Sequence, residues 1–212
     1  MSIRGKLVAA IVLTVIGPVV TIGVALAAFG TLGERSDDVE RAGADQARAL
    51  ELKFAVTDMN GWQTAWGYDG GRSRPTFEAS AERTKELMEA ASAEFTAARE
   101  RALLDELGRA YDAFMGLDAD AWEALQAGRE AETRRILLGP EIRNFKAMAS
   151  TADALADEQE RRADVAASEF DDARTTARRE LVAVGIGAGV VIVLLLITAQ
   201  DVVRLALERR AT

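Results

Sequence analysis

Two long blocks of uncharged, mainly aliphatic residues dominate the hydropathy pattern of the chain. No charged residue occurs between positions 7 and 32, and residues 7–29 form an almost continuous apolar run. A second uncharged block, rich in Val, Ile and Leu, covers residues 181–199. A hydrocarbon core of about 30 Å is crossed by about 20 helical residues. The pattern therefore predicts two transmembrane helices, residues 7–29 and 181–199.

The intervening residues 30–180 have the pattern of long helices joined by short turns. The turn signals are Gly70-Gly71 through Pro75, Gly128, and Gly139-Pro140. They predict helices from the first span to about Asp69, from Pro75 to about Phe95, from Ala97 (with Thr96 as cap) to Ala127, and from Glu130 or Pro140 into the second span. The fold class is all-α, an up-down four-helix bundle. Apolar or small residues, mostly three or four apart, form the predicted buried face, or seam, of the last helix: Phe145, Met148, Ala152, Leu155, Ala166, Phe170, Ala173 and Ala177.

The charges around the first block predict its orientation. Arg4 and Lys6 precede it and acidic residues follow it, so residues 1–6 and 200–212 are expected in the cytoplasm and residues 30–180 outside the plasma membrane. A cleaved signal peptide is the alternative, because Ala25-Leu26-Ala27 has the small-x-small form of a cleavage site. The apolar run is longer than the usual hydrophobic region of a signal peptide, which favours the span.

Composition narrows the function. The chain has no Cys and no His, which excludes disulfides, thiolate nucleophiles and imidazole chemistry, so we expect no enzyme, no catalytic residue, no cofactor and no metal site. Residues 34–180 carry a net charge of -11, which disfavours nucleic acid as a partner. The Ala-rich seams bury little apolar area for a stable monomer, so we expect a homodimer.

The segment from Asp58 to Asp69 stands out because it holds two of the three tryptophans at the membrane-distal end of the first helix. Trp62 and Trp66 are four residues apart and are expected on one helical face. Aromatic and amide side chains suit a small-molecule site, nearby carboxylates suit an ammonium group, and nearby arginines suit a carboxylate. The alternative is a bundle core or dimer interface. The candidates for either role are Asp58, Asn60, Trp62, Gln63, Trp66, Tyr68, Asp69, Arg72 and Arg74.

Together these features resemble the sensor half of bacterial methyl-accepting chemotaxis proteins of the four-helix-bundle class. The most specific local likeness, to actinobacterial receptors of this type, is the run Asp58-Met-Asn-Gly-Trp-Gln-Thr-Ala-Trp66, supported by Arg101-Ala-Leu-Leu-Asp105 and Ala121-Trp-Glu-Ala-Leu-Gln-Ala-Gly128. The resemblance implies a homodimer that binds a small molecule or a binding protein, shifts its fourth helix, and passes that motion through the second span. The signal-relay and methylated coiled-coil regions of that family do not follow in residues 200–212, which look like the start of a truncated relay helix.

The alternative function is a membrane-anchored helical stalk without a ligand, which dimerises with itself or with full-length receptors. Both functions require the same architecture of two spans and a helical domain. They differ in whether the aromatic segment holds a small molecule or only packs.

Overall fold

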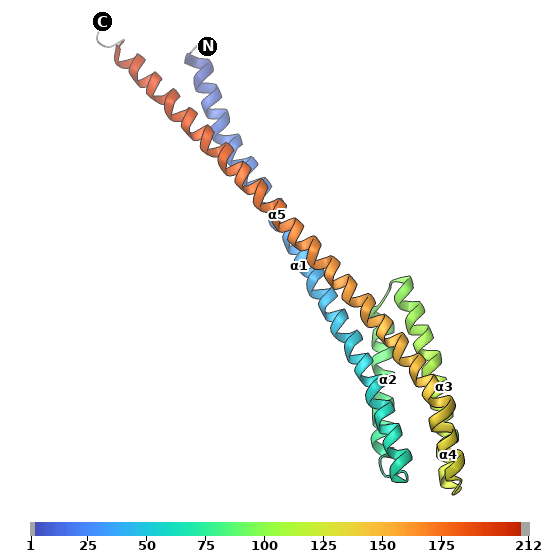
Figure 1. Cartoon of the computed structure of the whole chain (residues 1–212). Helices are drawn as coiled ribbons and strands as arrows, with labels where there is room; N and C mark the ends of the chain where they lie inside the picture. The colour runs from blue at the N-terminus through green and yellow to red at the C-terminus, as the bar shows by residue number, and fades with distance from the viewer. Residues whose placement is uncertain (1–2, 209–212) are drawn as a thin grey trace. The chain divides into compact units, whose positions relative to one another are not determined.

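The computed structural model describes the backbone of residues 3–208 and the side chains of residues 14–200 and Arg204. Within this part of the chain the structure consists of helices joined by short turns, with no strand (Figure 1). The all-α prediction is confirmed, and the predicted helix ends lie close to the observed ones. The elements in chain order are α1 (Ile3–Asp69), α2 (Arg74–Glu94), α3 (Ala98–Gln126), α4 (Glu130–Ile136), the π-helical segment η1 (Leu137–Glu141) and α5 (Ile142–Glu208).

Helices α1 and α5 each contain a stretch long and apolar enough to cross a membrane. In the most apolar 18-residue window of α1 only 6% of the residues are buried within the chain, and in that of α5 none are. A helix in the core of a water-soluble domain would be buried by its neighbours. The prediction of two long apolar helices is therefore confirmed.

Glycines with positive φ angles end two of the helices. Gly70 and Gly71, with φ of 71° and 90°, follow α1, and Gly128, with φ of 73°, follows α3. Residues with a Cβ rarely adopt this left-handed conformation. A Cβ on Gly71 would also lie 2.6 Å from the Trp122 ring. The predicted turns at these positions are confirmed.

The start of α3 differs from the prediction. Thr96 does not cap this helix; Ala97 is its N-cap, with no side-chain oxygen to offer. The carboxylate of Glu100 instead accepts a hydrogen bond from the Ala97 backbone N–H at 2.9 Å. A carboxylate in the first turn satisfies a helix start in this way, so neither a hydroxyl nor a glycine is needed there.

The Gly139-Pro140 pair does not separate two helices. It lies inside η1, and the chain remains helical from Glu130 through η1 into α5. Pro140 has no N–H to donate, and a short π-helical turn accommodates such a residue without ending the helix. Of the two predicted starts for the last helix, Glu130 is therefore the observed one.

The chain divides into two compact units. Residues 1–39 and 166–212 form the first, in which α1 and α5 are joined by an ion pair between Arg35 Nη1 and Glu169 Oε2 at 2.5 Å. In the same unit Pro18 of α1 and Ile192 of α5 line a shared apolar groove of about 360 Å³. The two long apolar segments thus lie against each other within this unit.

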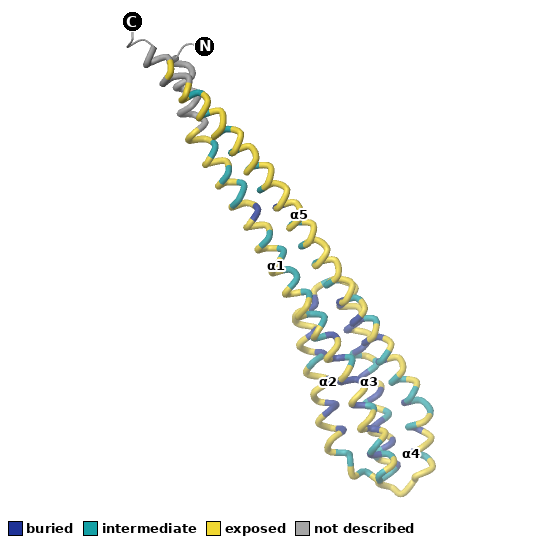
Figure 2. Tube along the Cα trace, turned by 60° about the vertical axis from the view of Figure 1, so that its left-hand side comes forward, coloured by how far each residue is buried: buried dark blue, intermediate teal, exposed yellow. Residues whose placement is uncertain are grey.

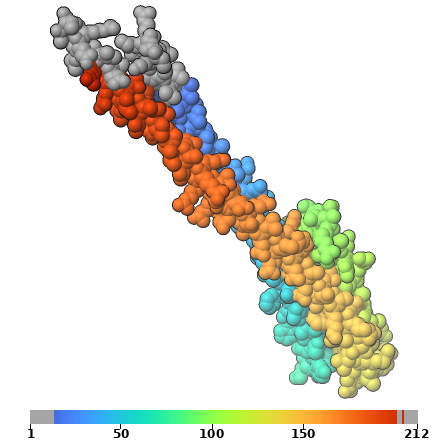
Figure 3. All heavy atoms as spheres, turned by 45° about the horizontal axis from the view of Figure 1, so that its top comes forward, coloured from blue at the N-terminus to red at the C-terminus, as the bar shows by residue number. Residues whose placement is uncertain are grey.

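Residues 40–165 form the second unit, which holds most of the buried side chains (Figure 2). Its core is one apolar cluster to which α1, α2, α3, α4 and α5 all contribute. On the face visible in Figure 3, the yellow-to-orange part of α5 lies between the cyan part of α1 and a green segment near residue 100. The seam predicted for α5 is buried here at Met148, Ala152 and Leu155. The largest apolar core residues are Trp66, Phe77, Phe95, Phe114, Leu52, Met59 and Leu107.

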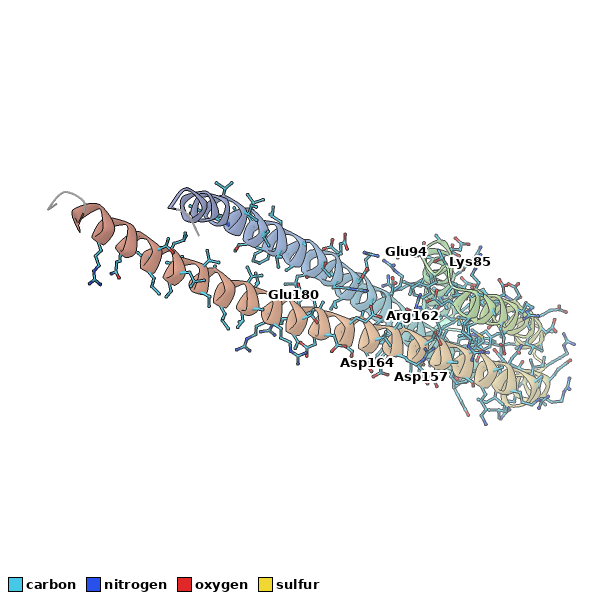
Figure 4. The ribbon with its side chains drawn as sticks, turned by 90° about the horizontal axis from the view of Figure 1, so that it is seen from above. Lys85, Glu94, Asp157, Arg162, Asp164 and Glu180 are labelled. Carbon is cyan, nitrogen blue, oxygen red and sulfur yellow. The ribbon has the colours of Figure 1, made fainter. Side chains whose placement is uncertain are left out.

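A buried polar layer interrupts this core near the start of α3. Glu100 is fully buried and accepts hydrogen bonds from Gln159 Nε2 at 2.8 Å and from Arg162 Nη1, both on α5. Figure 4 shows Arg162 on the side of α5 that faces the other helices, opposite Asp157 and Asp164. We call Glu100, Gln159 and Arg162 the Glu100 layer. It holds α5 to α3 through charge-assisted hydrogen bonds.

Candidate functional site

The two tryptophans at the end of α1 have different surroundings. Trp66 is fully buried, whereas Trp62 is 38% exposed. The ring that contacts Trp66 belongs to Trp122 of α3, at a centroid distance of 5.4 Å and an interplanar angle of 88°. Residues four apart on a helix are offset by about 40°, which is enough to leave one ring at the edge of the core. Trp66 is therefore a core residue, and the expected pairing with Trp62 is not observed.

Arg74, at the first turn of α2, fills the space between these aromatic rings. Its guanidinium lies 4.9 to 5.3 Å from the ring centroids of Phe77, Trp122 and Trp66. Its Nη1 is 2.6 Å from Oδ2 of the buried Asp118. Because these contacts and a further pair with Glu78 use its donors, Arg74 is not free to bind a ligand carboxylate.

Asp118 is the centre of this cluster, although sequence reasoning did not single it out. Besides the Arg74 pair, its Oδ1 accepts a hydrogen bond from Trp66 Nε1 at 3.2 Å. Burial raises the pKa of Asp118 above its usual value, and the Arg74 charge opposes that shift. Asp118 thus joins α1, α2 and α3 at one buried point.

Most of the other charged candidates hold the turn between α1 and α2. Asp69 accepts a hydrogen bond from the Ser73 hydroxyl at 2.6 Å, which lowers the pKa of its carboxyl group. Asp58 accepts one from the Ser80 hydroxyl at 2.7 Å. Arg72 is exposed and donates from Nε to the backbone oxygen of Asp69. These side chains have structural partners, so the structure does not direct them toward a common ligand.

Three of the predicted residues line one pocket with a volume of about 310 Å³. Asn60, Gln63 and Tyr68 belong to the end of α1, together with Thr64 and Gly67 of the same segment. The opposite walls come from α3, α4, η1 and α5. We call it the Gln63 pocket, and its remaining main lining residues are Leu125, Thr133, Arg134, Leu137, Leu138 and Ile142.

Only a residue without a side chain fits at position 67 in the wall of this pocket. A Cβ at position 67 would overlap with the Leu137 side chain of η1. Gly61, by contrast, has open space around it. The close approach of α1 and η1 at Gly67 therefore accounts for one of the two glycines in the segment.

Glu141, the last residue of η1, is a second acidic group that sequence reasoning missed. It is 1% exposed, and neither carboxyl oxygen has a hydrogen-bond partner among the described residues. Burial raises its pKa to about 8, with a further increase from Asp118, while Gln63 and Arg74 act in the opposite direction. Glu141 is thus mostly protonated at neutral pH, next to the Gln63 pocket.

The pocket is lined mainly by neutral side chains. Among the described residues there is no group of acidic side chains arranged to hold a metal ion. The pocket combines apolar side chains with a few amide and hydroxyl groups, as small-molecule sites generally do.

The chain was compared with protein-family models, curated proteins and solved structures. None of the three comparisons finds a match.

Proposed function

We propose that the chain is a membrane-anchored sensor module. In this proposal α1, α2, α3 and the continuous α4-η1-α5 segment form a four-helix bundle outside the plasma membrane, and the apolar parts of α1 and α5 are its two spans. The bundle binds a small extracellular molecule in the Gln63 pocket. The observation that carries the proposal is that the pocket wall includes η1 and Ile142, the beginning of the helix that continues into the second apolar segment.

The position of η1 supplies a physical route for a signal. A ligand changes an equilibrium only when it binds two conformations with different affinity. Leu137 and Leu138 line the pocket from a π-helical turn, and such turns are frequent at functional sites. A ligand that packs against them favours one position of η1, and the start of α5 moves with it. This proposal agrees with the resemblance to chemotaxis receptors.

Exposed apolar residues on α1 support the homodimer and also favour the second candidate function, a stalk without a ligand. Leu50, Phe54, Gly61 and Tyr68 are exposed, with Phe54 and Tyr68 each at 77%. Their spacing puts them along one stripe of α1. Exposed aromatics in a stripe indicate a protein contact. Both functions use this surface, so only ligand binding separates them.

Ligand binding should raise the melting temperature of the full chain in detergent micelles. We expect at least one compound among millimolar amino acids, organic acids and amines to do so, because a ligand at 100 times its Kd adds about 2.7 kcal/mol of stability. Thr64→Phe should abolish the shift by filling the pocket. Unfolding is followed by tryptophan fluorescence.

Thr57→Phe is the matched control for this experiment. Thr57 and Thr64 are both exposed on α1, and each hydroxyl donates to the backbone oxygen four residues earlier. Thr57 does not line the pocket. If no compound raises the melting temperature, or if both variants lose the increase equally, the stalk function would be favoured.

The orientation can be tested with single cysteines, because the chain has none of its own. Ser92→Cys, at an exposed position of α2, should react with a membrane-impermeant maleimide on intact cells. Ser2→Cys should react only after lysis. The reverse labelling pattern would contradict the proposed topology.

A further inference from the structure

The carboxyl group of Glu141 lacks the hydrogen-bond donors that a buried acid normally has. Both oxygens are buried without a partner. Leaving such a group unpaired is unfavourable, and more so when it is charged. The neighbouring cation, Arg74, already pairs with Asp118 and Glu78. The Gln63 amide is the nearby donor that lowers the pKa of Glu141, but it forms no hydrogen bond of ordinary geometry with that carboxyl.

Gln63 connects this carboxyl group to the pocket. Of the three side chains that influence the pKa of Glu141, only Gln63 also lines the pocket. Gln63 is 3% exposed, and among the described residues its amide nitrogen forms no hydrogen bond of ordinary geometry, although it lies near enough to Asp118 and Glu141 to lower the pKa of both. Gln63 thus lines the pocket and also acts on the Glu141 carboxyl, which is buried behind the lining, so a rotation of Gln63 would open the way from the pocket to Glu141.

The remaining walls disfavour an anionic ligand. Arg134 is paired with Glu130, with Nη2 and Oε2 3.2 Å apart, so these two lining residues neutralise each other. The hydroxyl groups of Thr64 and Thr133 donate to backbone oxygens. A ligand carboxylate would find no free arginine and would be repelled by Glu141 once that group ionises. A ligand cation, by contrast, would be attracted by the ionised Glu141 carboxylate and would meet no unpaired arginine.

The apolar part of the pocket limits the rest of the ligand. Leu125, Leu137, Leu138 and Ile142 contribute hydrocarbon surface. At about 310 Å³ the cavity lies at the lower end of small-molecule sites. The matching ligand is a short hydrocarbon chain with one charged end.

We propose that the Gln63 pocket binds a small primary amine in its ammonium form, with the Glu141 carboxylate as counter-ion and Gln63 as the side chain that rotates to admit it. This inference rests on the proposed sensor function and names its ligand class. The hydrocarbon part of the amine packs against the leucines of η1.

Binding of this kind is linked to the release of a proton. The groups that act on Glu141 are Asp118 from α3, Arg74 from α2 and Gln63 from α1, and together with burial they give a pKa of about 8. At pH 7 the empty site therefore holds a proton, while a primary amine with a pKa of about 10.4 is already charged. The ammonium replaces that proton. Affinity should rise by up to about tenfold per pH unit below pH 8 and level off above it.

The test uses the full chain in detergent micelles and three probes of equal length: butylamine, butyrate and butanol. Isothermal titration calorimetry at pH 6, 7 and 8, in buffers of different ionisation enthalpy, measures affinity and proton release. We expect butylamine to bind at least about 30-fold more tightly than the other two, the effect of one buried charge pair. About one proton should be released at pH 7.

Two glutamate-to-glutamine variants compare the effect of a buried carboxyl group on butylamine binding with the effect of a solvent-exposed one. Glu141→Gln should weaken butylamine binding at least about 30-fold and remove the proton release. Glu89→Gln, which changes an exposed residue of α2 outside the pocket, should weaken binding less than about threefold. Melting of each variant, followed by tryptophan fluorescence, establishes that it is folded.

The outcomes distinguish the two proposals. Unchanged butylamine affinity in Glu141→Gln, or no proton release, overturns the role of Glu141. Tighter binding of butyrate or butanol that Thr64→Phe abolishes overturns the amine class while the sensor proposal stands. If none of the three probes binds, and no compound in the melting-temperature screen stabilises the chain, both proposals are overturned.

Discussion

Replacing Arg74 with alanine should lower the free energy of unfolding of residues 40–165 by about 3–5 kcal/mol. The side chain pairs with Asp118, which is almost completely buried, and lies against three aromatic rings. Removing one member of a buried ion pair leaves the other charge without compensation, and this penalty exceeds the net contribution of the pair. Arg74→Lys should have an unfolding free energy between those of the parent chain and Arg74→Ala, because a lysine restores the charge but not the planar contacts with the rings.

Tryptophan fluorescence measures this effect in the full chain. The three tryptophans, at positions 62, 66 and 122, all belong to the unit formed by residues 40–165, so apolar segments that stay helical in detergent do not obscure the transition. Arg83→Ala is the matched control. Arg83 is also on α2 and pairs with Glu51, but both side chains are largely exposed, so its loss should cost less than about 1 kcal/mol. Equal effects of the two substitutions would contradict a stabilising role for the Asp118 cluster.

Glu141→Gln should stabilise the protein at pH 8 and have little effect at pH 4. The pKa of Glu141 is about 8 in the folded chain, against an ordinary value of 4.5. Between these values the folded state keeps the proton and the unfolded state loses it, so stability is highest below pH 4.5 and decreases as pH rises toward 8. The slope is about 1.4 kcal/mol per pH unit. Glutamine remains neutral throughout and avoids this loss.

The measurement is the difference in unfolding free energy between Glu141→Gln and the parent chain at each pH. Taking the difference cancels the contributions of the other acidic groups, as long as they do not interact with position 141. Asp118 does interact with it, so Glu141→Gln should also change the titration of Asp118. A difference that is constant between pH 5 and pH 8 would contradict the raised pKa.

Much of the helix layout could be predicted from the sequence because it depends on local signals. Gly70, Gly71 and Gly128 mark turns that require positive φ angles, and the three-to-four spacing of Met148, Ala152 and Leu155 marks a buried face. The predictions failed at two places where the turn residues themselves did not decide the backbone. Glu100 satisfies the start of α3 in place of Thr96, and a π-helical turn accommodates Gly139-Pro140.

The candidate site was only partly predictable. Asn60, Gln63 and Tyr68 were recognised by composition, but their partners come from α3, α4 and η1, and only the tertiary packing brings those helices to α1. A usable signal for the buried acids was nevertheless present. Asp118 follows Phe114 by four residues, and Glu141 precedes Phe145 by four, so both fall on apolar faces of their helices. A charged residue on such a face indicates a buried polar site.

The Glu100 layer restricts how α5 can move along its own axis. A slide of one helical turn, about 5.4 Å, would separate Glu100 from both Gln159 and Arg162 and leave a fully buried carboxylate with only one backbone donor. Intermediate positions would break these bonds without forming new ones. The helix should therefore change register in discrete steps rather than by a continuous slide.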